Sequence, residues 1–130
     1  MARKGYHALL SDRQVLKHLE VGVLLVNDAG MRRLNCLYRG IDRTTDVLSF
    51  PLLTNEKRPF TSHLLLGDIV ISLPQAGRQA AEYEATFYQE LSRLLVHGLL
   101  HLLGYDHEKN NYQAAKMRRL EAELAEALCL

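Results

Sequence analysis

The chain has 130 residues, with 16 Lys or Arg against 15 Asp or Glu, so its formal net charge is +1. Hydrophobic residues make up 48% and charged residues 24%, which is typical of a folded globular chain and excludes a disordered one. A nearly neutral protein does not bind polyanions through its overall charge, so a nucleic-acid contact requires a local basic patch. Two cysteines are too few for a fold built on disulfides. We expect one domain, residues 1–130, in the cytoplasm, without a signal peptide or a membrane span.

The first half of the chain is expected to alternate helices and strands. Ser11 begins a helix whose apolar residues continue at helical spacing to Leu19, and residues 21–26 form a buried strand. The next helix ends at Gly40, which can adopt the left-handed conformation, and residues 46–50 form a second strand that the following proline ends. One side of this helix is expected to carry its apolar residues, Met31, Leu34, Leu37 and Tyr38.

The second half contains one strand and three helices. Residues 53–62 are polar and form a surface loop, and residues 64–72 form the third strand. Gly67-Asp68 within this strand predicts a bulge or a close approach of another backbone segment. The expected helices span about 74–83, 86–103 and 111–127. This order of elements predicts an α+β or α/β domain with at least three strands.

Three histidines near the end of the long apolar helix have the spacing of metal ligands. His97 and His101 are four residues apart, so their side chains share one helix face about 5–6 Å apart at Cβ and can bind one ion. Gly104 can end the helix and turn the chain so that His107 becomes the third ligand. Three histidines leave a fourth tetrahedral position open, as in catalytic zinc sites. Unpaired polar groups are costly in such an apolar segment, so metal binding explains the three histidines better than a chance arrangement does.

The same segment matches the metzincin zinc-peptidase pattern H-E-x-x-H-x-x-G-x-x-H at all but one of its fixed positions. Gly98 replaces the Glu that serves as general base in such peptidases. The sequence therefore predicts a metal site without the peptidase base. Asp106 is interpreted as a turn residue or a partner of a ligand rather than a catalytic acid. The remaining histidines lack ligand spacing: His7, His18 and His63.

Three separated motifs together resemble one family. The first contains Leu34-Asn35, Tyr38-Arg39, Asp42 and Thr45-Asp46-Val47-Leu48-Ser49-Phe50-Pro51. The second is Leu66-Gly67-Asp68-Ile69-Val70-Ile71-Ser72, and the third runs from His97-Gly98 to Gly104-Tyr105-Asp106-His107. The combination resembles the YbeY endoribonucleases, which take part in ribosomal RNA maturation. The chain departs from the family in a short region before Val21 and in Thr44, where proline is common.

The resemblance implies a single small α+β domain with a mixed sheet of three to four strands packed against helices. It places the metal site at the end of a central helix that lines a basic cleft. It implies that His97, His101 and His107 bind one ion per chain, Zn²⁺ or another divalent metal, and that Arg39 is a catalytic residue of the cleft. The implied function is that of a single-strand-specific, zinc-dependent endoribonuclease in small-subunit rRNA 3′ end processing and ribosome quality control. The implied partners are single-stranded ribosomal RNA precursor and the ribosomal subunit or its associated proteins, with no membrane.

The chemistry of Arg39 suits this role, because a guanidinium group is planar, permanently charged and able to bind phosphate in bidentate fashion. Residues 31–43 carry four arginines against one aspartate, a local charge of +3. The general base stays open between Asp68, Asp106 and a phosphate oxygen of the substrate. The nucleophile is either a water molecule whose pKa the metal lowers or the RNA 2′-hydroxyl. Two alternatives remain, a zinc-dependent peptidase-like hydrolase and a non-catalytic ribosome- or RNA-binding module.

Overall fold

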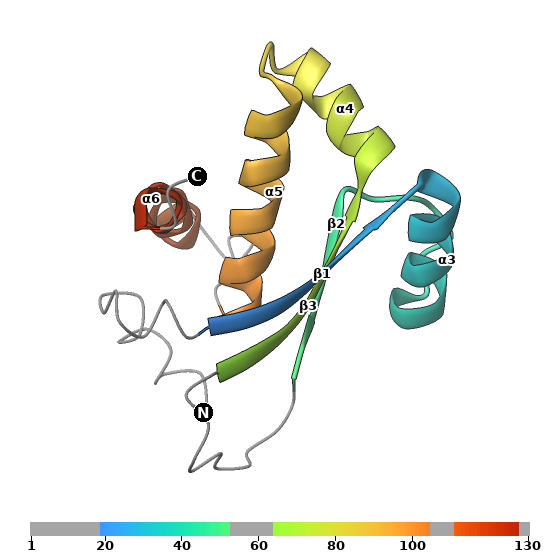
Figure 1. Ribbon diagram of the computed structural model, residues 1–130, viewed down its shortest axis with the longest axis horizontal. Helices are drawn as coiled ribbons and strands as arrows, with labels where there is room; N and C mark the ends of the chain where they lie inside the picture. The colour runs from blue at the N-terminus through green and yellow to red at the C-terminus, as the bar shows by residue number, and fades with distance from the viewer. Residues whose placement is uncertain (1–18, 53–63, 105–110, 128–130) are drawn as a thin grey trace.

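A computed structural model describes residues 19–52, 64–104 and 111–127, which form an α+β fold around a three-stranded mixed sheet (Figure 1). The strands are β1 (Leu19–Val26), β2 (Val47–Pro51) and β3 (Leu64–Ser72). Strand β3 is central, parallel to β1 and antiparallel to β2. The predicted α+β class and mixed sheet are confirmed. The predicted helix from Ser11 lies outside the described residues, except that Leu19, assigned to that helix, belongs to β1.

Four helices accompany the sheet in the described part of the chain: α3 (Asp28–Arg39), α4 (Leu73–Glu82), α5 (Phe87–Leu102) and α6 (Asn111–Ala127). The first three begin at polar N-caps, where Asn27, Ser72 and Thr86 accept hydrogen bonds from backbone N–H groups. Helix α3 ends at Gly40, whose φ of 70° is the predicted left-handed conformation. None of the described helices is long and apolar enough to cross a membrane.

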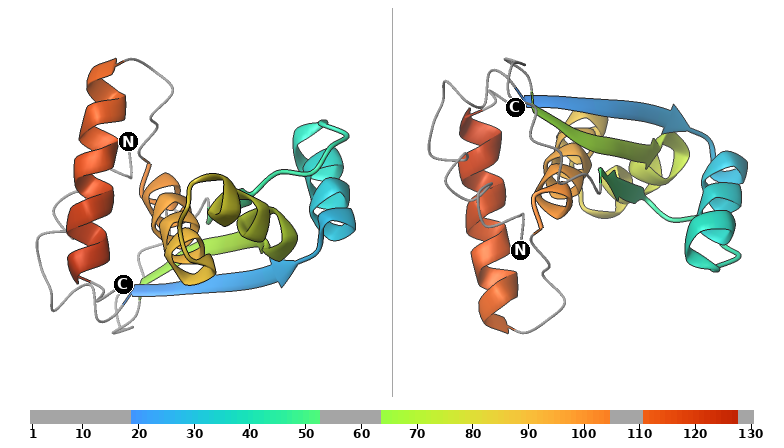
Figure 2. Two further views of the ribbon diagram at one scale, coloured as in Figure 1. Left: turned by 90° about the horizontal axis from the view of Figure 1, so that it is seen from above. Right: turned by 90° about the horizontal axis from the view of Figure 1, so that it is seen from below.

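The sheet separates two hydrophobic clusters, because successive side chains of a strand point to opposite faces. On one face Ile69 and Ile71 pack with α5, and α6 packs on the outer side of α5 (Figures 1 and 2). On the other face Leu48 and Val70 pack against Met31 of α3. Helices α3 and α5 therefore lie on opposite faces of the sheet, a separation that decides which predicted site residues can meet.

The exposed side of α3 differs from the prediction. Met31 is fully buried, but Leu37 is 70% exposed and Tyr38 is 62% exposed, with an edge-on contact to Phe50. The polar residue Asn35 is buried instead, and its amide donates a hydrogen bond to a backbone carbonyl. The helical period explains the exposure of Leu37, because a residue six positions after Met31 lies well away from the buried face.

The predicted bulge in β3 is confirmed, with Leu66 as the extra residue between two successive pairs with β1. Gly67 has a φ of 140°, and a Cβ at this position would collide with the carbonyl oxygen of Phe50 on β2. The predicted close approach of a second backbone segment is therefore also present. Strand β2 extends through Pro51, one residue beyond the prediction, which an edge strand of the described sheet tolerates.

A polar network joins α4 and α5 near one end of the sheet. Glu90 of α5 is only 2% exposed, and its carboxylate accepts hydrogen bonds from Arg93 at 2.6 and 2.9 Å and from Gln79 at 2.7 Å. Gln79 also donates to Asp46 at 3.3 Å, which connects the network to the start of β2. The hydrogen bonds from Arg93 hold the pKa of Glu90 below its ordinary value of 4.5, against the opposing effect of burial.

This network predicts an acid-sensitive part of the stability. Because the pKa of Glu90 is lower in the folded state, its ionised form stabilises the fold above the unfolded pKa, and this contribution is lost as the pH falls through the folded pKa. Below pH 4.5 the free energy of unfolding, measured by urea denaturation, should therefore fall more steeply in the wild type than in Glu90→Gln. The exposed Glu82→Gln on α4 serves as control, and parallel curves for wild type and Glu90→Gln would contradict the prediction.

Candidate functional site

The last turns of α5 bring two of the three predicted ligands together. The Nε2 atoms of His97 and His101 are 3.0 Å apart, and the two rings lie edge-on with centroids 4.6 Å apart. Two nitrogens bound tetrahedrally to one ion at about 2.0–2.1 Å are roughly 3.3–3.4 Å from each other, so the observed pair is close to that spacing. Both histidines are partly buried. The donor type and spacing fit a shared metal ion, and their role as ligands stays a prediction.

The chain turns after these histidines as the sequence predicts. Helix α5 ends at Leu102, and Gly104 adopts a φ of 98° while its N–H donates to the carbonyl of His101 at 3.0 Å. His107, the third predicted ligand, lies outside the described residues, as does Asp106. Within residues 19–52, 64–104 and 111–127, no group of three His, Cys, Asp or Glu side chains could hold a metal ion. The complete three-histidine set therefore remains untested by the geometry.

The far side of the His97 ring contacts α6. Nδ1 of His97 and Oε1 of Glu121 are 2.9 Å apart, and the two side chains are 17% and 23% exposed. A carboxylate accepts hydrogen bonds, so this contact favours the His97 tautomer that carries its proton on Nδ1. Glu121 is not among the residues predicted from the sequence, because it follows His97 by 24 residues on a separate amphipathic helix. No local spacing marks such a contact.

Gly98 faces the sheet rather than the space beside the histidines. A Cβ at this position would lie 2.8 Å from Cγ2 of Ile69 and 3.3 Å from both Oγ of Ser49 and Cγ2 of Val47. The Ser49 hydroxyl donates to the Gly98 carbonyl at 3.0 Å, which ties the helix backbone to β2. A glutamate here would enter the packed interface between α5 and the sheet. The position where a metzincin carries its base therefore has no room for one in this fold.

Arg39 lies on a different part of the molecule from the histidine pair. It is exposed in the last turn of α3, on the face of the sheet opposite to α5 (Figure 1). It forms no hydrogen bond or ion pair with another described residue. In the same basic patch, Arg32 is bound to Asp42 by two hydrogen bonds of 2.8 and 3.1 Å. The structure thus leaves Arg39 at the surface and does not bring it to the described histidines.

Asp68, one of the candidate bases, also faces α3. Together with Tyr38 and Phe50 it lines a pocket of about 540 Å³, and its carboxylate lies against Gly22 of β1. The adjacent residue in β3, Ile69, points to α5, so the alternation of the strand directs Asp68 to the other face. Asp68 is therefore not positioned to take a proton beside His97 and His101.

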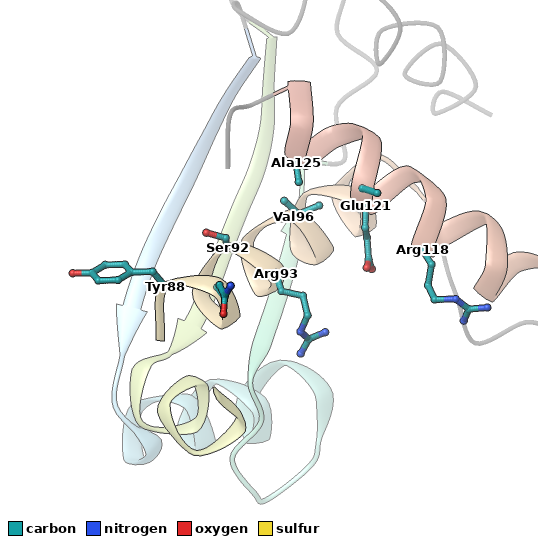
Figure 3. Close-up of a pocket in the computed structure, with 9 residues that line it drawn as sticks. Tyr88, Ser92, Arg93, Val96, Arg118, Glu121 and Ala125 are labelled. Carbon is teal, nitrogen blue, oxygen red and sulfur yellow. The ribbon is translucent and has the colours of Figure 1, made fainter. Parts of the chain in front are cut away.

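A groove of about 570 Å³ separates α5 from α6 on the histidine side of the molecule (Figure 3). Arg93 of α5 and Arg118 of α6 line it, and Glu121 lies between them along the groove, with all three charged groups directed to the same side. Arg118 is exposed, and the Arg93 side chain stays 44% exposed while paired with Glu90. Cationic side chains therefore occur close to the carboxylate that contacts His97.

Comparison with known proteins gives a consistent assignment. The family model described as Endoribonuclease YbeY matches residues 1–129. A protein named Endoribonuclease YbeY from Roseiflexus sp. is 48% identical over 133 residues, covering all of this chain and 83% of the relative. Its namesake in Desulforamulus reducens is 51% identical over 111 residues, covering 84% and 72% of the two chains. The namesake in Thermodesulfovibrio yellowstonii is 48% identical over 106 residues, covering 82% of this chain and 65% of the relative.

A solved structure supports the same fold. The solution structure of TM1509 from Thermotoga maritima matches with a TM-score of 0.54 and 30% sequence identity, covering 94% of this chain and 85% of that one. The relatives define a class of protein, the endoribonucleases. Within that class, the chain belongs to the YbeY family, as its three motifs predicted.

The position of Gly98 yields a stability prediction. Gly98→Ala should lower the free energy of unfolding by about 1–2 kcal/mol, because the clash with the stiff, fully buried Ile69 exceeds the gain in helix propensity. Gly77→Ala in α4 is the matched control, since nothing lies within 4 Å of its added Cβ, and it should raise stability by up to about 1 kcal/mol. Urea denaturation measures both. Equal stabilisation by the two alanines would show that Gly98 does not face the sheet.

Proposed function

We propose that this protein is a metal-dependent endoribonuclease that cleaves single-stranded RNA during ribosomal RNA maturation in the cytoplasm. The observation that carries the proposal is the His97–His101 pair, with Nε2 atoms 3.0 Å apart on the helix of the third family motif. The name shared by the relatives, Endoribonuclease YbeY, supports the reaction class. The three motifs that resemble the family support the finer role, in small-subunit rRNA 3′ end processing and ribosome quality control with the ribosomal subunit or its proteins as partners.

Three histidines would hold the metal in this proposal: His97, His101 and His107. Imidazole nitrogen suits Zn²⁺ and also other divalent transition metals, and a three-histidine set leaves a position for substrate. One ion per chain is expected. When bound, it would supply Lewis-acid stabilisation of charge on the phosphate and lower the pKa of an attacking water molecule.

Arginines of the chain would hold the RNA. Arg93 and Arg118 line the groove beside Glu121, where they can contact phosphates of a strand that passes the histidine pair. Arg39 lies on the opposite face of the described sheet from the histidine pair; its guanidinium can bind a phosphate with a bidentate pair of hydrogen bonds, and its catalytic role stays a prediction that rests on the family resemblance. Such contacts release counterions, so RNA binding should weaken as the salt concentration rises.

The two alternatives make different demands on the site. Peptide hydrolysis needs a base beside the first histidine, and Gly98, packed against Ile69, provides none. A non-catalytic ribosome- or RNA-binding module would retain the arginine contacts but would need the metal only to hold the fold together. Metal removal distinguishes the binding module from the proposed enzyme, because a structural metal supports folding and its removal unfolds the chain.

Metal content and cleavage test the proposal together. Elemental analysis of the purified protein should find one zinc or other divalent ion per chain, and alanine at His97, His101 or His107 should lower metal content and RNA cleavage alike. His63→Ala, outside the motif, is the control and should change neither. A chelator should abolish cleavage of a labelled single-stranded RNA while circular dichroism stays unchanged, and a peptide library should remain intact. Undiminished metal in all three variants, or unfolding on chelation, would contradict the proposal.

The role of Arg39 is tested with the metal in place. Arg39→Ala should retain the bound metal and the unfolding midpoint but lose about 10²-fold in RNA cleavage, the usual effect of removing one group that stabilises transition-state charge. Arg39→Lys should restore little of the RNA cleavage, because the lysine ammonium is a point charge and cannot form the bidentate contact of a guanidinium group with phosphate. Arg119→Ala, exposed on α6 and outside both the basic patch and the lining of the groove, is the control. Cleavage at the wild-type rate by Arg39→Ala would remove this arginine from the mechanism.

A further inference from the structure

We infer that Glu121 is a positioning residue for the proposed metal centre, because it holds His97 in one tautomer and one orientation from the neighbouring helix. The inference rests on the proposed metal-dependent function and adds to it a side chain outside the three-histidine motif. Its basis is the contact of 2.9 Å between Oε1 of Glu121 and Nδ1 of His97.

The hydrogen bond determines which nitrogen of His97 is available. Since Nδ1 carries the proton that Glu121 accepts, the neutral ring has its lone pair on Nε2. That Nε2 is the atom that faces Nε2 of His101 at 3.0 Å. The Nε2 lone pair of His97 is thus directed to the His101 ring, where two ligands can share an ion. Without the carboxylate, the ring could rotate about its χ angles or exchange tautomers.

The backbone that carries Glu121 is anchored in the core. Glu121 follows Leu120 directly on α6, and the buried residues Met117, Leu120 and Leu124, which are 2%, 7% and 3% exposed, anchor that helix in the core with α5. The Glu121 side chain is 23% exposed, so the bond is only partly screened by water. This placement differs from a flexible surface ion pair, in which both side chains lose entropy to meet.

The chemical consequence is a stronger and better-oriented ligand. A carboxylate that accepts the proton of one ring nitrogen raises the basicity of the other, and loss of such a partner typically weakens metal binding by 10–100-fold. Arg93 and Arg118 line the same groove, but neither forms a hydrogen bond with Glu121 among the described residues. Helix α6 therefore contributes to the site although it carries none of the predicted ligands.

The test compares three variants of the full chain by two measurements. Zinc affinity is measured by competition with a chromophoric chelator, and the tautomer of His97 is read from the ¹⁵N shifts of the metal-free protein. Glu121→Ala should weaken zinc binding by about 10–100-fold and abolish the predominance of the Nδ1–H tautomer. Glu121→Gln, which keeps the shape and an acceptor oxygen but not the charge, should also bind zinc more weakly than the wild type, by less than Glu121→Ala. Glu123→Ala, exposed two residues further along α6, is the control and should match the wild type.

The outcomes separate this inference from the proposed function. If Glu121→Ala binds zinc as tightly as the wild type does, the inference about Glu121 is overturned and the proposed function is not. An Nε2–H tautomer of His97 in the metal-free wild type would have the same consequence. A wild type that binds no divalent metal would overturn the proposed function and the inference with it. If Glu121→Ala does not fold, Glu121→Gln decides, because a loss of affinity supports the role of Glu121 and an unchanged affinity contradicts it.

Discussion

The contact between Gly98 and Ile69 is the constraint on which the described part of the site depends. Without a side chain at position 98, α5 packs closely on β2 and β3, and the hydroxyl of Ser49 fixes the helix backbone at that point. Residue 97 lies about 100° around the helix from residue 98, so with Gly98 packed on the sheet the His97 ring lies to one side of that interface, where it contacts Glu121 of α6. The same contact removes the position of a peptidase base and presents two imidazoles as a pair.

A second constraint comes from α6, which packs on the outer side of α5. Its apolar residues enter the core, and Glu121 then meets His97 at the edge of that interface. The structure thus places the helix that carries two of the predicted ligands beside a helix whose carboxylate contacts one of them. The groove between the two helices is lined by Arg93, Arg118 and Glu121, so cationic side chains lie near the carboxylate that contacts His97, a predicted ligand. This combination suits a phosphodiester, whose charge must be met by cations, better than a peptide bond.

Local sequence patterns predicted those features that depend on near neighbours. The spacing of four residues placed His97 and His101 on one helix face, and Gly40 and Gly104 adopt the positive φ that was predicted for them. Gly67 lies at the predicted bulge and close backbone approach. Prediction from local patterns failed where the exposure or the contacts of a side chain depend on the rest of the fold. The apolar residue Leu37 is exposed because the buried face of α3 follows the sheet and not hydrophobicity alone. Glu121 contacts His97 across two helices, and the separation of Arg39 from the histidines follows from the sheet between them, which no local pattern reveals.

The central claim is that the histidine pair belongs to a metal centre in a protein that cleaves RNA. X-ray absorption spectroscopy of the zinc-loaded full chain tests this most directly, because it reports the type, number and distance of the ligands. The account predicts three imidazole nitrogens at about 2.0–2.1 Å from zinc, with one remaining light-atom ligand at a similar distance. A spectrum in which sulfur dominates the first coordination sphere, or in which the imidazole signal persists in the double variant His97→Ala/His101→Ala, would contradict it.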